Sequence, residues 1–215
     1  MTCYVALDGP DGCGKSTQAA ALATWLDAEG ADVLHVREPG STPVGEALRS
    51  LLLSPDTGDL QPVTEALLFS AARAELVHRV VAPALAAGKV VVAERCYLST
   101  VVYQVLAGAH AAGSGVELRW FEDLTRRVQG ACLPDAIFVL DVPEQVSAQR
   151  RGRRRDPADR IEGRDASFHQ RVREGYLQAA AREPRAEVLD AAGSFDGLQG
   201  ALRERVLALS SRSLA

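Results

Sequence analysis

The sequence predicts a doubly wound α/β fold, in which helices cover both faces of a five-stranded parallel sheet. Short apolar runs alternate along the chain with longer helical patterns, and most of these runs lack a polar side, as strands buried on both faces do. The chain has 215 residues, 47% of them hydrophobic, which is enough for one sizeable core. The expected strands span residues 3–7, 32–36, 90–93, 136–140 and 186–189.

Helical patterns occupy the stretches between these strands. Because strand–helix–strand crossovers are right-handed, the alternation favours a parallel sheet within a single domain of residues 1–215. The stretch "AGAHAAGSG" at 107–115 is expected to form a surface loop, and the charged run at 150–165 is expected to be too polar to be buried. The expected helices span residues 15–29, 43–53, 61–87, 98–130 with a glycine break, 143–152, 166–182 and 195–209.

Charge and cysteine content limit the possible partners. The formal net charge of −4 gives no general attraction to a polyanion, so we expect no nucleic-acid partner. The absence of a basic leader and of a long apolar run predicts no membrane partner and a cytoplasmic location. The cysteines form no CxxC pair and have no histidine at metal-ligand spacing, so reduced thiols are expected at Cys3, Cys13, Cys96 and Cys132.

Residues 9–16, "GPDGCGKS", fit the phosphate-loop pattern G-x-x-x-x-G-K-[ST] between an expected strand and an expected helix. Glycines allow backbone N–H groups to converge on phosphate oxygens, and the helix N-terminus adds partial positive charge. Lys15 is expected to reach the terminal phosphates, and the hydroxyl of Ser16 to bind Mg²⁺; an unrelated glycine-rich turn is the alternative. The expected ATP-binding residues are Gly9, Pro10, Asp11, Gly12, Cys13, Gly14, Lys15, Ser16 and Thr17.

A magnesium site of this kind usually needs an acid at the end of another strand. Glu94 follows "VVVA" and Asp141 follows "IFVL", so two acids compete for this role. Asp141 precedes an expected helix start and is as readily explained as a structural cap. Glu94 stands directly before Arg95, at the carboxyl end of a strand, where ligands bind in such sheets. We therefore expect Ser16 and Glu94 to bind the metal.

Several segments together resemble the bacterial thymidylate kinases, of the P-loop nucleoside monophosphate kinase family. The resemblance covers nearly the whole chain and implies phosphorylation of dTMP to dTDP with ATP and Mg²⁺, by a homodimer. It rests on "GPDGCGKST", "REPGST" (37–42), "LRSLLL" (48–53), "LLFSAARAEL" (67–76), "ERCYLSTVVYQ" (94–104), and "DRIE" (159–162) with "FHQRVREGYL" (168–177).

The resemblance also implies where the acceptor nucleotide binds. It implies that Phe69 stacks on thymine, that Arg73 hydrogen-bonds the base, and that Tyr103 lies where a 2′-hydroxyl would collide. Arg95 would hold the acceptor phosphate, and Asp11 would face the acceptor sugar and the metal. The full set of implied substrate-binding residues is Asp11, Glu38, Pro39, Arg49, Phe69, Arg73, Arg95, Ser99, Thr100, Tyr103 and Gln104.

The charged run at 150–165 resembles the mobile lid of this family. Phosphoryl transfer between two anionic nucleotides requires positive charge around the transferring oxygens, which arginine side chains supply. Arg151, Arg153, Arg155 and Arg160 are candidates, and the sequence leaves open which of them reaches the phosphates. The expected catalytic residues are Lys15, Glu94, Arg95, Arg151, Arg153 and Arg155.

The chain departs from the family pattern at Glu94-Arg95-Cys96, where the family usually has Asp-Arg followed by Tyr, His or Phe. We expect Glu94 to fold back into the space that the small Cys96 side chain leaves. Two alternative functions remain: a kinase for another nucleoside monophosphate, and a catalytically weakened nucleotide-binding regulatory protein. A GTPase switch is disfavoured because the chain contains no asparagine and so lacks the N-K-x-D signature.

Overall fold

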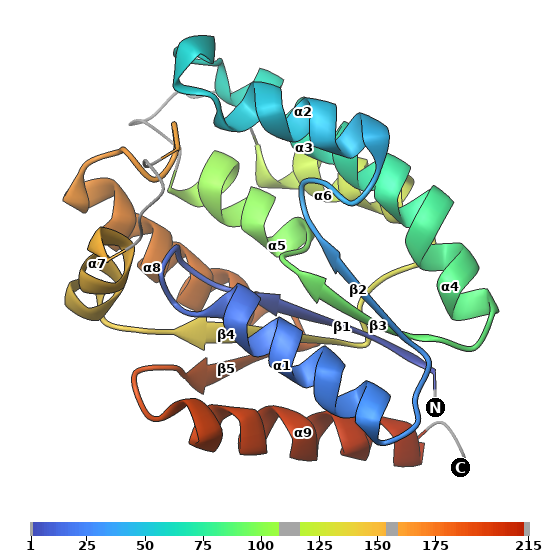
Figure 1. Ribbon diagram of the computed structural model, residues 1–215. Coiled ribbons are helices and arrows are strands. Elements are labelled where there is room, and N and C mark those ends of the chain that lie inside the picture. The colour runs from blue at the N-terminus through green and yellow to red at the C-terminus, as the bar shows by residue number, and fades with distance from the viewer. Residues whose placement is uncertain (1, 108–116, 154–158, 213–215) are drawn as a thin grey trace.

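The computed structural model describes residues 2–107, 117–153 and 159–212, and it confirms the expected fold class. Five parallel strands form one sheet in the order β2-β3-β1-β4-β5 (Figure 1). Each strand lies within one or two residues of its expected limits. The strands are β1 (Cys3–Asp8), β2 (Val33–Arg37), β3 (Val90–Glu94), β4 (Ala136–Asp141) and β5 (Ala186–Asp190).

The helices also follow the expected pattern, with two long predicted helices divided by π-helical turns. The predicted helix 61–87 contains α3 (Pro62–Leu76), the π-helical turn η2 (Val77–Val81) and α4 (Ala82–Ala86). The predicted helix 98–130 corresponds to α5 (Tyr97–Thr100), which begins one residue earlier, the π-helical turn η3 (Val101–Leu106) and α6 (Leu118–Gln129). The other helical elements are α1 (Lys15–Ala28), α2 (Pro43–Leu53), the 3₁₀ turn η1 (Pro55–Thr57), α7 (Glu144–Gly152), α8 (Ala166–Arg182) and α9 (Phe195–Arg212).

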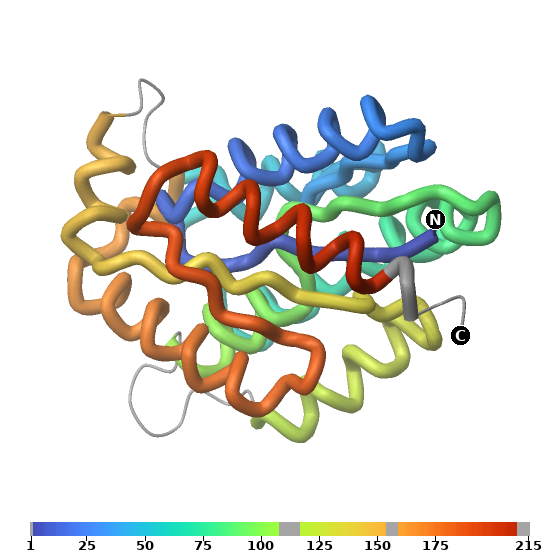
Figure 2. The backbone as a smooth tube through the Cα atoms, turned by 90° about the horizontal axis from the view of Figure 1, so that it is seen from below, coloured from blue at the N-terminus to red at the C-terminus, as the bar shows by residue number. Residues whose placement is uncertain are grey.

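Alternate residues of β1 face different helical layers because side chains along a strand point to opposite faces of the sheet. Val5 and Leu7 pack in one core with side chains of α1 and α9. Tyr4 and Ala6 pack in the other core, with side chains of α3, η3 and α8. Figure 2 shows α1 and α9 running beside each other along the first of these faces. Asp8 continues the series of Tyr4 and Ala6 and therefore belongs to the second face.

The carboxyl ends of the central strands meet at one edge of the sheet. Leu7 of β1 pairs with Glu94 of β3, and Glu94 also pairs with Arg37 of β2. The segments that follow β1, β2 and β3 therefore come together, although the ends of these strands are 29 to 86 positions apart in the sequence. In open α/β sheets this edge is where ligands bind.

The expectation that residues 150–165 are too polar to be buried is wrong for Arg160 and Ile161. Both side chains are buried, because the Arg160 guanidinium pairs with the buried carboxylate of Glu65 on α3, at 2.6 Å. Residues 154–158, which include Arg155, lie outside the described part of the chain. The same holds for 108–115 of the predicted surface loop, whose first residue, Ala107, is buried.

None of the helices in the described residues is both long and apolar enough to cross a membrane.

Candidate active site

Helix α7 packs directly against the phosphate loop. Gly12 has φ +87°, in the left-handed region, and a Cβ atom there would lie 2.6 Å from the carbonyl oxygen of Ser147. The Ser147 hydroxyl donates to the carbonyl of Asp11 at 2.5 Å. A side chain at position 12 would therefore push α7 away from the loop, so the requirement for glycine here arises from close packing as well as from backbone conformation.

Lys15 stands at the first position of α1 and is buried with its ammonium inside the loop. Its Nζ donates to the carbonyl oxygens of Gly9 and Pro10, both at 2.9 Å, and lies 3.8 Å from Asp11 Oδ1. The ammonium, the converging loop backbone and the helix N-terminus form an arrangement suited to phosphate groups.

Asp8, the last residue of β1, lies at the base of the site, and the sequence analysis gave it no role. Its carboxylate is fully buried, accepts hydrogen bonds from several neighbouring groups, and lies 3.9 Å from the guanidinium of Arg95. The donors to Oδ1 are Gly9 N at 2.9 Å, Ser99 Oγ at 2.7 Å and Tyr176 Oη at 2.7 Å. Those to Oδ2 are Ser99 N at 3.1 Å, Cys96 N at 3.2 Å and the Cys96 thiol at 3.5 Å. This carboxylate therefore ties the phosphate loop to the segment after β3 and to α8.

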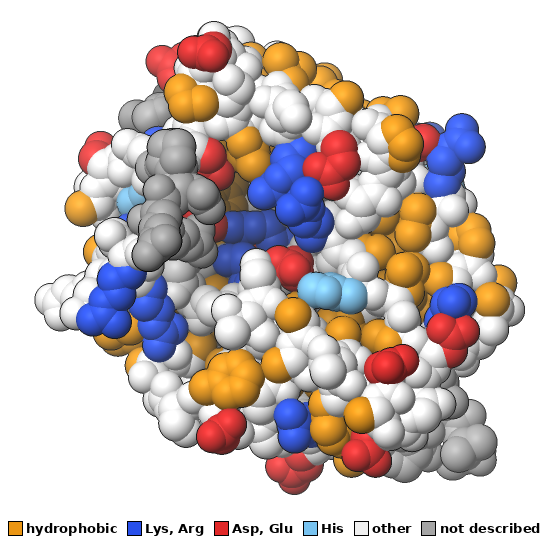
Figure 3. Space-filling view, viewed as in Figure 1, with side chains coloured by type: hydrophobic (Ala, Val, Ile, Leu, Met, Phe, Trp, Pro, Cys, Tyr) orange, Lys and Arg blue, Asp and Glu red, His pale blue; other side chains and the backbone are white. Residues whose placement is uncertain are grey.

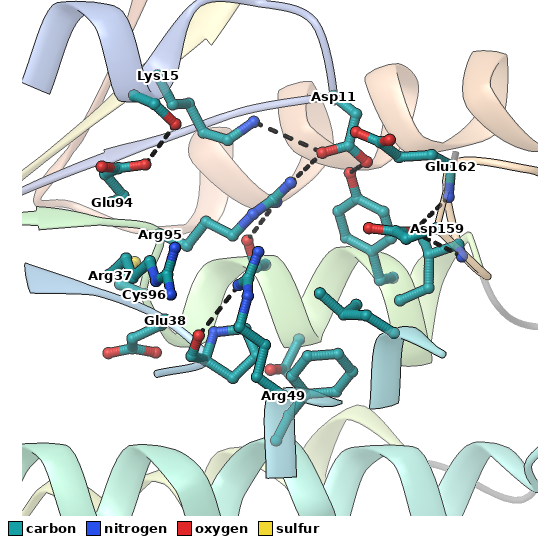
Figure 4. A pocket seen from close by; sticks show the side chains of 18 of the residues that line it. Asp11, Lys15, Arg37, Glu38, Arg49, Glu94, Arg95, Cys96, Asp159 and Glu162 are labelled. Carbon is teal, nitrogen blue, oxygen red and sulfur yellow. Dashed lines mark hydrogen bonds and ion pairs between the residues drawn. The ribbon is translucent and has the colours of Figure 1, made fainter. Parts of the chain in front are cut away.

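Arg95 lies next to Asp8 and points into the cleft (Figure 4). Its backbone has φ +71°, a left-handed conformation that costs a non-glycine residue on the order of 1 kcal/mol. The guanidinium forms an ion pair with Asp11, and the Tyr103 hydroxyl donates to the other oxygen of Asp11 at 2.8 Å. Although burial favours the neutral carboxyl, the charges of Arg95 and Lys15 hold the pKa of Asp11 well below its usual range.

The same contacts act on Arg95. Burial opposes its positive charge, but the neighbouring Asp11 and the hydroxyl groups of Tyr103 and Tyr176 hold its pKa well above the ordinary value. A second hydrogen bond, from Arg95 Nη1 to Ser99 Oγ at 3.0 Å, fixes the guanidinium plane. Arg95 is therefore a permanent, oriented cation at the base of the cleft.

The cleft has a volume of about 340 Å³ and holds a concentration of Lys and Arg side chains, visible as the blue group in the central hollow of Figure 3. All the substrate-binding residues implied by the resemblance line it. These are Asp11, Glu38, Pro39, Arg49, Phe69, Arg73, Arg95, Ser99, Thr100, Tyr103 and Gln104.

The guanidinium groups of Arg37, Arg49 and Arg95 line this cleft close to the carboxyl edge of the sheet. Arg49 on α2 donates to the carbonyl of Pro39 at 3.0 Å. Burial and the nearby positive charge of Arg37 lower the pKa of Arg49, and Arg95 adds to the same repulsion. Because these like charges repel one another, an anion bound among them would be stabilised.

Arg73 is held at the far end of the cleft by groups from two other segments. Its Nε donates to Glu38 Oε2 at 2.6 Å, and its Nη2 donates to Thr100 Oγ1 at 3.0 Å. Burial raises the pKa of Glu38, against the opposing effect of Arg73. Phe69 stands one helical turn before Arg73 and also lines the cleft, as the spacing on α3 predicts.

Glu94 lies on the α1 side of the sheet. Its Oε2 accepts a hydrogen bond from Ser16 Oγ at 2.5 Å, and its Oε1 lies 3.0 Å from His35 Nε2. Burial would raise its pKa, but the contacts with His35 and Ser16 outweigh this and lower it. The expectation that Glu94 folds back towards Cys96 is wrong, because Ser16 and His35 hold the carboxylate on the α1 side of the sheet, whereas the Cys96 thiol is buried in the core on the other side, 3.5 Å from Asp8 Oδ2.

The residues at the phosphate loop fit a magnesium ion. Within the described residues, no group of three or more His, Cys, Asp or Glu side chains could hold a metal by itself. Mg²⁺ usually takes one or two protein oxygens together with nucleotide phosphates and water, and the Ser16 hydroxyl and Glu94 carboxylate are such oxygens. The rival acid, Asp141, instead forms two hydrogen bonds with Arg173, at 2.7 and 2.8 Å.

The candidate lid arginines differ in their surroundings. Arg151 lies beside the phosphate loop, where its Nη1 donates to the carbonyl of Asp11 at 3.0 Å and its Nη2 to Glu144 at 2.6 Å. Arg153 is exposed. Arg160 is paired with Glu65, and its Nε donates to the carbonyl of Leu52 at 2.9 Å, so it joins the end of α2 to α3.

Three of the site residues that sequence reasoning missed are Asp8, Tyr176 and His35. Asp8 directly follows the apolar run "CYVAL", and its alternation with Tyr4 and Ala6 could have indicated a buried carboxylate. Tyr176 lies inside a motif used for the resemblance, but its position under Arg95 depends on how α8 packs. His35 carries no local signal, because its contact with Glu94 depends on the pairing of β2 with β3.

Comparisons with known proteins show the family of this chain. The thymidylate kinase family model matches residues 7–201. A thymidylate kinase of Symbiobacterium thermophilum is 41% identical over 208 residues, covering 96% of this chain and 93% of the relative. Those of Deinococcus radiodurans and Caulobacter vibrioides are 41% and 39% identical, covering 91% and 95% of this chain and 92% and 95% of the respective relatives. With its phosphate loop opening into a cleft of arginine side chains, this chain belongs to the thymidylate kinase family.

Proposed function

We propose that this protein transfers the γ-phosphoryl group of ATP to dTMP, giving dTDP and ADP. The observation that carries the proposal is the cleft itself, which joins a phosphate loop containing Lys15 to guanidinium groups and an aromatic side chain. A phosphate oxygen of dTMP attacks the γ-phosphorus, a new P–O bond forms, and the bond to the β-phosphate oxygen of ADP breaks. The protein contributes position and positive charge rather than covalent chemistry.

Residues of the phosphate loop hold ATP in this proposal. The Lys15 ammonium stabilises the negative charge on the phosphoryl group while it is transferred. Arg95 and Arg49 bind the acceptor phosphate, with Arg37 at the rim. Arg151 is the described lid arginine nearest to the loop, so it is the one that we assign to the transition state, while Arg153 and Arg155 remain candidates.

Phe69 and Arg73 are assigned to the thymine base. The hydrogen bonds from Arg73 to Glu38 and Thr100 orient the guanidinium before the base arrives, which lowers the entropic cost of ordering it. Tyr103, held by Asp11, is assigned to the sugar, where its ring would exclude a 2′-hydroxyl. The remaining implied contacts, Pro39, Ser99 and Gln104, support these groups.

Ser16 and Glu94 are assigned to Mg²⁺, which supplies charge neutralisation for the β- and γ-phosphates. The Ser16 hydroxyl and the Glu94 carboxylate already meet at 2.5 Å, so the two ligands would need little rearrangement. A cytoplasmic location is part of the proposal and agrees with the nucleotide substrates.

The proposal is tested by measuring ADP formation with dTMP, dUMP, UMP, dCMP and dGMP as acceptors. We expect the highest kcat/KM with dTMP and clear selection against UMP. A higher kcat/KM with another monophosphate would identify a different kinase of the same fold. Slow ATP hydrolysis that is indifferent to the monophosphate would identify a regulatory nucleotide-binding protein.

The assignment of the metal-side acid predicts different effects of neutralising Glu94 and Asp141. Glu94→Gln is expected to lower kcat roughly a hundredfold at saturating Mg²⁺, because it removes the charge that the cation needs. Asp141→Asn is the matched control and should change kcat less than about threefold, since Asp141 pairs with Arg173 instead. Wild-type kcat in Glu94→Gln would mean that Glu94 is only a structural acid at the end of β3.

A homodimer through α2 and α3 completes the proposal. These helices lie side by side on one flank of the molecule (Figure 1), and each presents an uncharged exposed stripe. Val44 and Leu51 of α2 are 50% and 46% exposed, and Leu67 of α3 is 46% exposed. Uncharged exposed stripes of this kind are typical of surfaces buried between subunits.

The dimer is tested by introducing a charge into this surface. Leu67→Glu is expected to give a monomer by light scattering, because a carboxylate buried between two apolar stripes has no partner. Leu177→Glu on α8, where the leucine is 38% exposed, is the control and should leave the mass unchanged. A wild-type chain that is itself monomeric at micromolar concentration would overturn the proposed assembly.

A further inference from the structure

His35 lies on β2, outside the motifs that carry the resemblance, yet its side chain contacts the proposed metal-side acid. We propose that His35 is a positioning residue, whose imidazole holds the Glu94 carboxylate against Ser16 and so sets the orientation in which Glu94 meets a divalent cation. This inference rests on the proposed phosphate loop and metal site, but it does not depend on which monophosphate is the acceptor.

The contact follows from the pairing of neighbouring strands. His35 pairs with Val92, and Arg37 pairs with Glu94, so His35 and Glu94 are diagonal neighbours two positions apart. Val90 and Val92 of β3 and Val33 of β2 pack into the core that α1 covers. Because alternate residues of a strand share a face, His35 and Glu94 face the same side, where Ser16 lies in the first turn of α1.

The two hydrogen-bonding groups use different oxygens of the carboxylate. His35 Nε2 lies 3.0 Å from Oε1, and Ser16 Oγ donates to Oε2 at 2.5 Å. A carboxylate held at one oxygen can rotate about its terminal bond, whereas contacts at both oxygens fix the plane. The Glu94 side chain is 17% exposed and that of His35 is 31% exposed, so water competes only partly for these contacts.

The length of the glutamate makes this support necessary. Glu94 has one more rotatable bond than an aspartate would have at the same position, and that bond must be ordered before the carboxylate can bind a cation. An aspartate carboxylate would stop short of His35 by about the length of one methylene group, on the order of 1 Å. The imidazole therefore compensates for the flexibility of this particular side chain, in the way that outer hydrogen-bond partners orient metal ligands elsewhere.

The test compares two substitutions of His35 by their effect on cation binding. His35→Phe keeps a planar aromatic ring, somewhat larger than imidazole, without a donor, and His35→Gln keeps an N–H group that can reach Oε1. Binding of Mn²⁺ is measured by electron paramagnetic resonance in the complex with a non-hydrolysable ATP analogue, and binding of dTMP is measured separately by calorimetry. We expect His35→Phe to weaken Mn²⁺ about tenfold, His35→Gln to stay within about threefold of wild type, and dTMP affinity to change in neither.

Glu94→Asp supplies the background that isolates the contact. Because the shorter carboxylate cannot reach the imidazole, adding His35→Phe to Glu94→Asp should weaken Mn²⁺ no further. Equal weakening in the two backgrounds would show that His35 acts by another route and would overturn the inference. Unchanged Mn²⁺ affinity in His35→Phe would overturn it as well.

A failure of the proposed function would look different. If the acceptor panel identified a monophosphate other than dTMP, the Mn²⁺ measurements would still test His35, since they need only the nucleotide analogue. If the analogue itself did not bind, the phosphate-loop assignment would fail and His35 would have no metal site to support.

Discussion

Lys15→Ala is expected to abolish phosphoryl transfer, with kcat lowered on the order of 10³-fold or more, while the fold stays intact. The ammonium is the one cation inside the phosphate loop, among the described residues, and it is held by two neutral carbonyl oxygens 2.9 Å away. Loss of one preorganised group aimed at developing charge typically costs 10² to 10³ in kcat, and here the group carries a full charge. Turnover is measured by ADP formation, and the fold by circular dichroism and urea unfolding.

The sequence provides a matched control for this variant. Only two lysines occur in the chain, and the other, Lys89, pairs with Asp32 on the surface at 3.0 Å. Lys89→Ala should leave kcat within about twofold of wild type, since exposed ion pairs contribute little. Near-normal turnover in a folded Lys15→Ala variant would contradict the assignment of the ATP site.

Asp8→Asn is expected to cause the largest loss of stability among substitutions at the site, about 3 kcal/mol in the free energy of unfolding. The buried carboxylate accepts hydrogen bonds from Gly9, Ser99, Cys96 and Tyr176, and an amide would direct N–H groups at donors that then lack an acceptor. For chains of this size 1 kcal/mol corresponds to roughly 2–4 °C, so Tm should fall by about 6–12 °C.

Asp190→Asn is the control for this effect. Asp190 ends β5 as Asp8 ends β1, but it is exposed and accepts from the backbone N–H of Ala192 at 2.8 Å. Its replacement should change stability by less than about 0.5 kcal/mol. Equal Tm values for the Asp8→Asn variant and the wild type would mean that the donors around Asp8 find other acceptors, and that this carboxylate does not hold the loop to β3 and α8.

The sequence by itself predicted the fold class and most of the element boundaries, because these depend on local periodicity and on glycine and proline positions. It also predicted the phosphate loop, where eight consecutive residues carry the whole signal. The residues assigned to the substrate came from short motifs that follow β1, β2 and β3 or lie on α2, α3, α5 and η3. All of them line one cleft, because the carboxyl ends of parallel strands meet at one edge of the sheet.

Only the tertiary structure decided what the individual charged groups contact. Arg160 belongs to a run that composition marks as solvated, yet its side chain is buried, because α3 presents the Glu65 carboxylate to it. The sequence predicted that the Glu94 carboxylate lies near Cys96. The pairing of β2 with β3 instead places His35 beside the Glu94 carboxylate. Ion pairs and hydrogen bonds act over a few ångströms between residues that can be far apart in the chain, so they depend on strand register and helix packing, which local sequence patterns do not encode.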